Sequence, residues 1–135
     1  MKTIGKLSAM FGILLGFVLS VEATQPSDMV NDIVAQLRQS NAKGLSKYFA
    51  PSVDLEILSN EKTSSKADAE SVLNSFFTKN RPESVKIVHR IDSKPDYKVL
   101  VLAMTANGKS FRTSISLKNN GNGFLITEVS IDEGN

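Results

Sequence analysis

The sequence predicts one α+β domain, in which helices precede a mostly antiparallel β-sheet. Two features of the chain lead to this prediction. Between residues 29 and 77 most apolar residues recur three or four positions apart, as on a helix face, whereas from residue 85 they recur at every second position, as in a strand. In addition, a chain of 135 residues is long enough to bury one core but too short for two.

The first two elements are expected to be helices. Pro26 and Ser27 suit a helix start, and the residues after them form one apolar face at helical spacing. This face consists of Met29, Val30, Ile33, Val34 and Leu37. Residues 41–44 interrupt the pattern, and Leu45–Phe49 then predicts a short second helix that Pro51 stops, because proline disfavours helix in the residue before it.

A strand and a third helix are expected next. Apolar residues at positions 53, 55 and 57 alternate with Asp54 and Glu56, which predicts an edge strand with one solvated face. Ser65, followed by Asp68, can cap the following helix, which residues 80–82 end. The apolar stripe of this helix consists of Ala69, Val72, Leu73, Phe76 and Phe77.

Four strands are expected after residue 84, within 85–91, 97–104, 111–117 and 124–131. Asn107 and Gly108 predict a two-residue hairpin turn, because both tolerate positive φ. This turn sets Met104 opposite Phe111 and places both on the buried face. Val99, Val101 and Ala103 then lie on the other face, beside Arg112, Ser114 and Ser116. The second turn, at residues 119–123, needs an odd loop or a bulge to keep the last strand in phase.

Composition excludes several classes of function. The chain has no Cys, which removes disulfide scaffolds, thiolate nucleophiles, Cys-ligated zinc and iron–sulfur clusters. A single His removes sites that need two imidazoles, and we expect no metal and no cofactor. A net charge of +2 argues against nucleic acid as a partner, since a polyanion binder carries a basic surplus.

Residues 1–23 have the layout of a secretory signal peptide. Lys2 and Lys6 precede the uncharged run Leu7–Leu19, and Val21 and Ala23 suit a cut before Thr24. The run is shorter than the ~20 apolar residues of a spanning helix, and no Cys follows it that could carry a lipid anchor. We therefore expect cleavage, a single domain over residues 24–135, no stable membrane anchor afterwards, and a periplasmic or secreted location.

Several stretches resemble a known fold family. They are Ser40–Lys43, Tyr48–Val53, Ser65–Glu70, Phe76–Phe77, Lys86–His89 and Phe111–Arg112. Together with the order helix–helix–strand–helix–four strands, they resemble the nuclear transport factor 2-like (cystatin-like) superfamily, and within it a secreted bacterial family of unknown function. The resemblance implies a cone-shaped α+β fold with helices packed on a curved sheet. It implies no activity, because the superfamily includes transport adaptors, isomerases, dehydratases and binding modules.

Four residues are candidates for a ligand-binding pocket or face. By alternation, His89 shares a face with Val85 and Ile87 and points inward, where it could act as a base or hydrogen-bond a ligand, unless it is a core or edge histidine. Arg112, which Arg90 could approach, suits a carboxylate or phosphate, unless it only covers a solvated face. Tyr48 and Phe76 could line a cavity or simply fill the core.

Isomerases of the resembled superfamily pair an inward carboxylate with a tyrosine. The candidates for such a pair are Asp54 or Glu56 with Tyr48 or Tyr97. Asp54 and Glu56 lie opposite the apolar face of their strand, however, so both are expected to be solvated.

The leading functional hypothesis is therefore a non-enzymatic exported module that binds a small molecule or an envelope protein. Homodimerisation is a further possibility, because the strip formed by Val99, Val101 and Ala103 lies away from the expected core. The alternatives are an isomerase or hydrolase of a small substrate centred on His89, and a scaffold in an envelope assembly. No residue is assigned a catalytic role.

Overall fold

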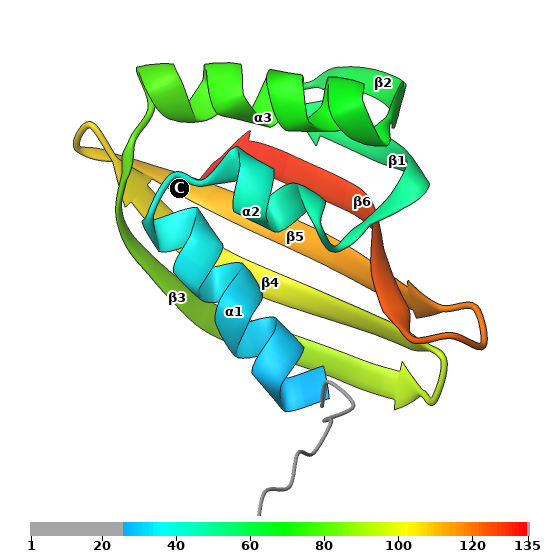
Figure 1. The fold of residues 1–135 in the computed structure, drawn as a ribbon. Coiled ribbons are helices and arrows are strands. Elements are labelled where there is room, and N and C mark those ends of the chain that lie inside the picture. Colours follow the sequence, from blue (N-terminus) through cyan, green and yellow to red (C-terminus); the bar gives the residue numbers. More distant parts are fainter. Residues whose placement is uncertain (1–25, 135) are drawn as a thin grey trace, which may run out of the picture.

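The protein forms a curved β-sheet with three helices on one face. The computed structural model describes residues 26–134 (Figure 1), so the expected signal peptide, residues 1–23, lies outside the described residues. The elements are α1 (Pro26–Arg38), α2 (Ala42–Ser46), β1 (Phe49–Ile57), β2 (Asn60–Ser65), α3 (Lys66–Lys79), β3 (Pro82–Lys94), β4 (Tyr97–Ala106), β5 (Lys109–Asn119) and β6 (Phe124–Glu133).

The six strands form one sheet in the order β2-β1-β6-β5-β4-β3. All neighbours pair antiparallel except β1 and β6, which are parallel. The prediction that residues 53–57 form an edge strand is wrong, because β2 covers β1 on its outer side. The strand β2 escaped prediction because it is almost entirely polar, with Ser64 as its one buried residue.

The second helix ends earlier than predicted. α2 spans Ala42–Ser46, and Phe49 instead starts β1, where it lies opposite Ile126. The signal for its start is Asn41, whose side-chain oxygen accepts a hydrogen bond from the Gly44 N–H at 2.9 Å. A Cβ atom at position 44 would meet the side-chain amides of Gln36 and Asn41, so a larger residue there would require these two flexible side chains to move.

The third helix begins and ends as predicted. The Ser65 hydroxyl accepts a hydrogen bond from the Asp68 N–H at 3.1 Å, and Asn80 forms the C-cap. Phe76 and Phe77 are buried on the sheet side of α3. The Phe76 ring also packs edge-on against Phe111 of β5, with 5.4 Å between ring centroids.

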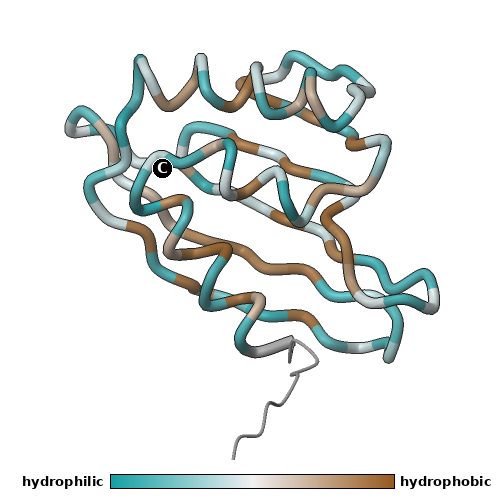
Figure 2. Tube along the Cα trace, in the orientation of Figure 1, coloured by the Kyte–Doolittle hydropathy of each residue, from teal (hydrophilic) through white to brown (hydrophobic). Residues whose placement is uncertain are grey.

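The hairpin between β4 and β5 has the predicted register. Ala106 pairs with Lys109 and Met104 with Phe111, and both turn residues have positive φ, 55° at Asn107 and 72° at Gly108. Hydrophobic residues gather along the helix faces and central strands, whereas the turns of the β3–β4, β4–β5 and β5–β6 hairpins are hydrophilic (Figure 2). The core therefore fills the space between the helices and one face of the sheet.

The last strand contains the expected bulge. Ser116 of β5 lies opposite Glu128, but Leu117 lies opposite Ile126, so Thr127 is the extra residue. Through this bulge Ile126, Val129 and Ile131 all reach the core, although they are not evenly spaced.

Candidate functional site

The helices cover one face of the sheet, and the other face, called here the open face, carries His89. In β3, Ile87 lies opposite Leu102 and His89 lies opposite Val101, so Val88 is an extra, bulged residue. The bulge reverses the alternation after Ile87. The prediction that His89 points inward is therefore wrong: its side chain is exposed on the open face.

Arg112 lies on the same open face, as expected from the hairpin register. It is exposed, lies opposite Ala103 of β4, and together with His89 lines a hollow of about 480 Å³. Arg90 does not approach it, because the bulge places Arg90 opposite Leu100, on the helix-covered side. The structure thus brings together the imidazole of His89 and one guanidinium.

An apolar strip lies beside this hollow. It consists of Ile91 of β3 and of Val99, Val101 and Ala103 of β4, and these residues share the open face. Ile91 is 39% exposed, and the bulged Val88, which precedes His89 and lines the hollow, is 57% exposed. Val99 and Ala103 are half-buried, and Val101 is 7% exposed although it is not part of the core cluster under the helices. An aliphatic strip on a sheet face that no helix covers is typical of an interaction surface.

The charges of the open face are segregated across the sheet. The basic groups lie toward its β3–β5 side and are Lys86, His89, Arg112 and Lys118. The acidic groups lie toward its β2–β1–β6 side and are Asp54, Glu56, Glu61, Glu128 and Asp132. Asp54 is exposed and accepts a hydrogen bond from Thr63 at 2.8 Å, which confirms its expected solvated position.

A hydrogen-bonded chain crosses three strands of the open face. The Tyr97 hydroxyl donates to the Ser116 hydroxyl over 3.4 Å, and Ser116 donates to Glu128 over 3.3 Å. Tyr97 is therefore linked through Ser116 to Glu128, and not to Asp54 or Glu56, the candidate carboxylates from the sequence. The sequence did not reveal this chain, because the pairing of Ser116 with Glu128 depends on the bulge at Thr127.

Tyr48 has a structural role that its sequence position did not reveal. Its hydroxyl donates to Asp32 of α1, and Gln36 donates to the other Asp32 carboxylate oxygen at 3.0 Å. Burial, together with the hydrogen bond to Asp32, raises the pKa of Tyr48 to about 12. The hydrogen bonds from Tyr48 and Gln36 lower the pKa of Asp32. This pair ties α1 to the start of β1.

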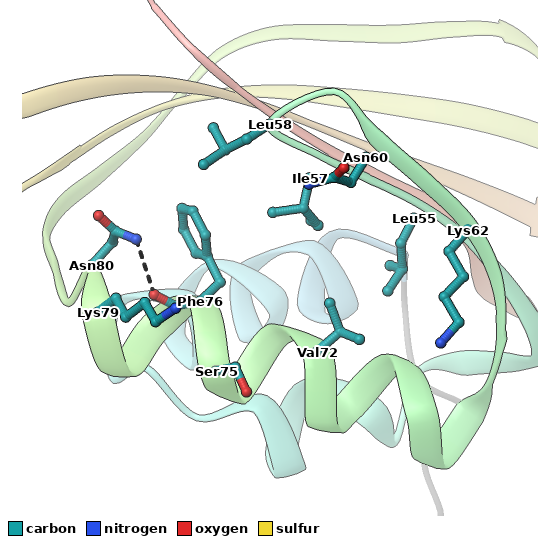
Figure 3. A pocket seen from close by; sticks show the side chains of 10 residues that line it. All are labelled: Leu55, Ile57, Leu58, Asn60, Lys62, Val72, Ser75, Phe76, Lys79 and Asn80. Carbon is teal, nitrogen blue, oxygen red and sulfur yellow. Dashed lines mark hydrogen bonds between the residues drawn. The ribbon is translucent and has the colours of Figure 1, made fainter.

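Phe76 lines a pocket between α3 and the β1–β2 hairpin. The pocket has a volume of about 380 Å³ and is bordered by Leu55, Ile57, Leu58, Asn60, Lys62, Val72, Ser75, Phe76, Lys79 and Asn80 (Figure 3). Phe76 is nevertheless only 6% exposed, so it belongs to the core and to the pocket wall at once. The pocket could not be foreseen because β2, which forms one side, was not predicted.

The described residues contain neither a group of three or more metal-ligating acidic or histidine side chains nor a helix long and apolar enough to cross a bilayer. Among the same residues, no protein group hydrogen-bonds to the imidazole of His89.

The fold defines an α+β protein of the NTF2-like and cystatin-like kind. An NTF2-like protein of unknown function from Cytophaga hutchinsonii matches with a TM-score of 0.61 and 12% identity, over 84% of this chain and 93% of that one. A cystatin-like domain of unknown function from Nostoc punctiforme matches with a TM-score of 0.64 and 6% identity, over 79% and 74%. At these identities the likeness concerns the fold alone.

Residues 30–132 match the family model described as domain of unknown function DUF4783, and the chain belongs to that family. A crystal structure of a DUF4783 protein from Bacteroides ovatus is similar to it, with a TM-score of 0.73 and 23% identity, over 77% of this chain and 94% of that one. No curated protein matches the chain significantly. The resemblance noted from the sequence is thereby confirmed, and it brings no known activity.

Proposed function

We propose that the protein is an exported, non-enzymatic binding module whose partner surface is the open face of the sheet, and that the partner is a second copy of the chain. The observation that carries this proposal is the arrangement of apolar and charged side chains on the open face. An apolar strip at Val99 and Val101 lies in a surface with basic groups toward one side and acidic groups toward the other. A two-fold rotation places the basic side of one copy over the acidic side of its partner.

The packing of the helix-covered face also supports the open face as the binding surface. Buried side chains from all three helices, such as Ile33, Leu45 and Phe77, fill the space against the sheet. We propose that this curved sheet and its helices form the cone that the resemblance implies, with an interior occupied by the core. A packed interior leaves the surface as the place for binding.

The test of self-association is the molar mass in solution. Light scattering at tens of micromolar is expected to give a dimer that Val101→Lys converts to monomer, because two desolvated ammonium groups would meet at the interface. Lys47→Ala, a change at an exposed residue away from the sheet, is the control and should remain dimeric. A wild-type monomer at this concentration would refute the dimer. If an envelope protein then co-purifies with the wild type but not with Val101→Lys, the face serves a scaffold instead.

An enzyme centred on His89 has less support. A catalytic base needs a partner that orients it and a pocket that holds the substrate against it. His89 is exposed and, within the described residues, no carboxylate or hydroxyl hydrogen-bonds to its ring.

Export is supported by the pattern of residues 1–23 alone. Mass spectrometry of the protein recovered from the periplasm should give a chain that begins at Thr24. A chain that retains Met1 and is found in the cytoplasm would contradict export.

A further inference from the structure

The pocket between α3 and the β1–β2 hairpin lies at the hairpin's turn, away from the open-face hollow, and has its own chemistry. Its apolar wall comes from both sides: Val72 and Phe76 from the helix, Leu55 and Ile57 from β1. Leu55 and Phe76 are almost fully buried, and Leu58 at the hairpin turn is 41% exposed. The wall is thus continuous with the core at its base and open to solvent at Leu58 (Figure 3).

The backbone at Leu58 is unfavourable for the residue it carries. Leu58 has φ 51° and Ser59 has φ 73°, which is the left-handed region that favours glycine and asparagine. The turn is fixed in place by a 2.8 Å hydrogen bond from the Leu58 N–H to the carbonyl of Ile131. An exposed, branched apolar side chain kept in this conformation at the edge of a pocket points to a functional constraint.

The charged groups of the pocket have one sign. Its lining includes Lys62 from β2 and Lys79 from α3, and it includes no acidic residue. The ion pair found among the described residues joins Lys98 to Asp92, so neither lining lysine is neutralised by an ion pair there. Asn60, Ser75 and Asn80 supply uncharged polar groups around the rim.

We propose that this pocket binds an amphiphilic carboxylate, meaning a single carboxylate on an aliphatic chain or small ring. The apolar part lies between Val72 and Leu58, over Phe76, and the carboxylate lies at the rim beside Lys62 or Lys79. The volume of about 380 Å³ falls within the usual range of small-molecule sites, roughly 300–1,000 Å³. A cationic amphiphile is disfavoured by both lysines, and a fully polar anion gains nothing from the apolar wall.

Decanoate is the probe, measured by isothermal titration calorimetry and by displacement of anilinonaphthalene sulfonate, a fluorescent apolar anion. Decanoate is expected to bind one per chain, and decanol and decyltrimethylammonium at least about tenfold more weakly, since each lacks the anion. No binding of decanoate up to ~1 mM would overturn the proposal. Equal binding of decanol would overturn its electrostatic part.

Variants locate the site. Lys62→Glu should weaken decanoate binding by about tenfold or more. Val72→Glu should abolish it, because the new glutamate carboxylate would lie in the apolar wall and repel the carboxylate of decanoate. Lys43→Glu, at an exposed lysine of α2 outside the pocket, is the matched control and should bind as the wild type does. Lys62→Gln keeps the test valid if a glutamate variant fails to fold. Unchanged binding by folded Val72→Glu would refute the location.

This pocket is independent of the open face. Val101→Lys is expected to dissociate the dimer and leave decanoate binding unchanged, whereas Val72→Glu should do the reverse. Loss of decanoate binding in Val101→Lys would place the ligand on the open face and overturn the assignment to the α3 pocket.

Discussion

The β1–β2 and β4–β5 hairpins have turns of the same length and the same left-handed backbone but different residues. Asn107 and Gly108 occupy the second turn, and Leu58 and Ser59 the first. Asparagine and glycine adopt positive φ at little cost, whereas leucine does so at about 1–2 kcal/mol. The residues of the β4–β5 turn thus match its backbone conformation without strain. The β1–β2 turn gives up stability at the place where a leucine borders the pocket.

The largest expected effect falls on Phe76, which connects the two hairpins. Its ring packs on Phe111 of β5 and also lines the pocket beside Leu58. Phe76→Ala should lower the free energy of unfolding by about 3–5 kcal/mol, as for a core phenylalanine. Urea denaturation, monitored by circular dichroism, measures this change in the free energy of unfolding. A loss below about 1 kcal/mol would show that the ring serves the pocket and not the core.

Exchanging the turn residues sharpens the comparison. The double change Leu58→Asn and Ser59→Gly should raise the free energy of unfolding by about 1 kcal/mol, because the new residues relieve the left-handed strain. The same change should weaken decanoate binding, since the Leu58 side chain is lost from the pocket. Asn107→Leu, the reverse change in the other hairpin, should destabilise the protein by a similar amount and leave decanoate binding unaltered. A destabilised Leu58→Asn, Ser59→Gly variant would show that Leu58 is there for packing.

The smallest effect concerns the anchor of β1. The pKa of Tyr48 is raised to about 12 in the folded protein, above its ordinary value of 10.0. Its contribution to stability is therefore present below pH 10 and lost as the pH rises toward 12. The melting temperature of the wild type should fall over this interval more steeply than that of Tyr48→Phe. Parallel curves for the two proteins would contradict the coupling of Tyr48 to Asp32.

At the acid end, the same pair predicts the opposite dependence. The pKa of Asp32 is lowered in the folded protein, so its contribution is present above about pH 4 and is lost as the pH falls through the folded-state pKa. Tyr48→Phe should reduce this acid sensitivity, because the hydrogen bond from Tyr48 is the main cause of the shift.

Those parts of the fold with strong local signals could be predicted. The α3 stripe, the Ser65 cap and the Asn107–Gly108 turn each specify their structure by residue type and spacing alone. The strand β2 could not be found, because a polar strand at a sheet edge has no alternation and its turn lacks glycine. The prediction of the orientation of His89 was wrong for a related reason. The bulge at Val88 inserts one residue into the strand, and no residue type around Val88 signals a bulge.

Among the candidate sites, too, only those that depend on strong local sequence signals could be predicted. The position of Arg112 on the open face could be predicted because the two-residue turn at Asn107–Gly108 fixes which residues of β4 and β5 lie opposite each other. The α3 pocket needs the unpredicted β2, and the chain from Tyr97 through Ser116 to Glu128 needs the register of β6 across its bulge.

The parallel pairing of β1 with β6 also determines when the sheet can be completed. Phe49 finds its partner only at Ile126, so this contact closes a loop that contains most of the described chain. Contacts so distant in sequence form slowly, because the loop entropy must be overcome first. While the chain is being synthesised, β1 and β2 have no neighbour on their inner side until β6 has emerged from the ribosome. The inner edge of β1 therefore stays unpaired through most of synthesis, and such an unpaired strand edge is prone to aggregation and is a target for chaperones.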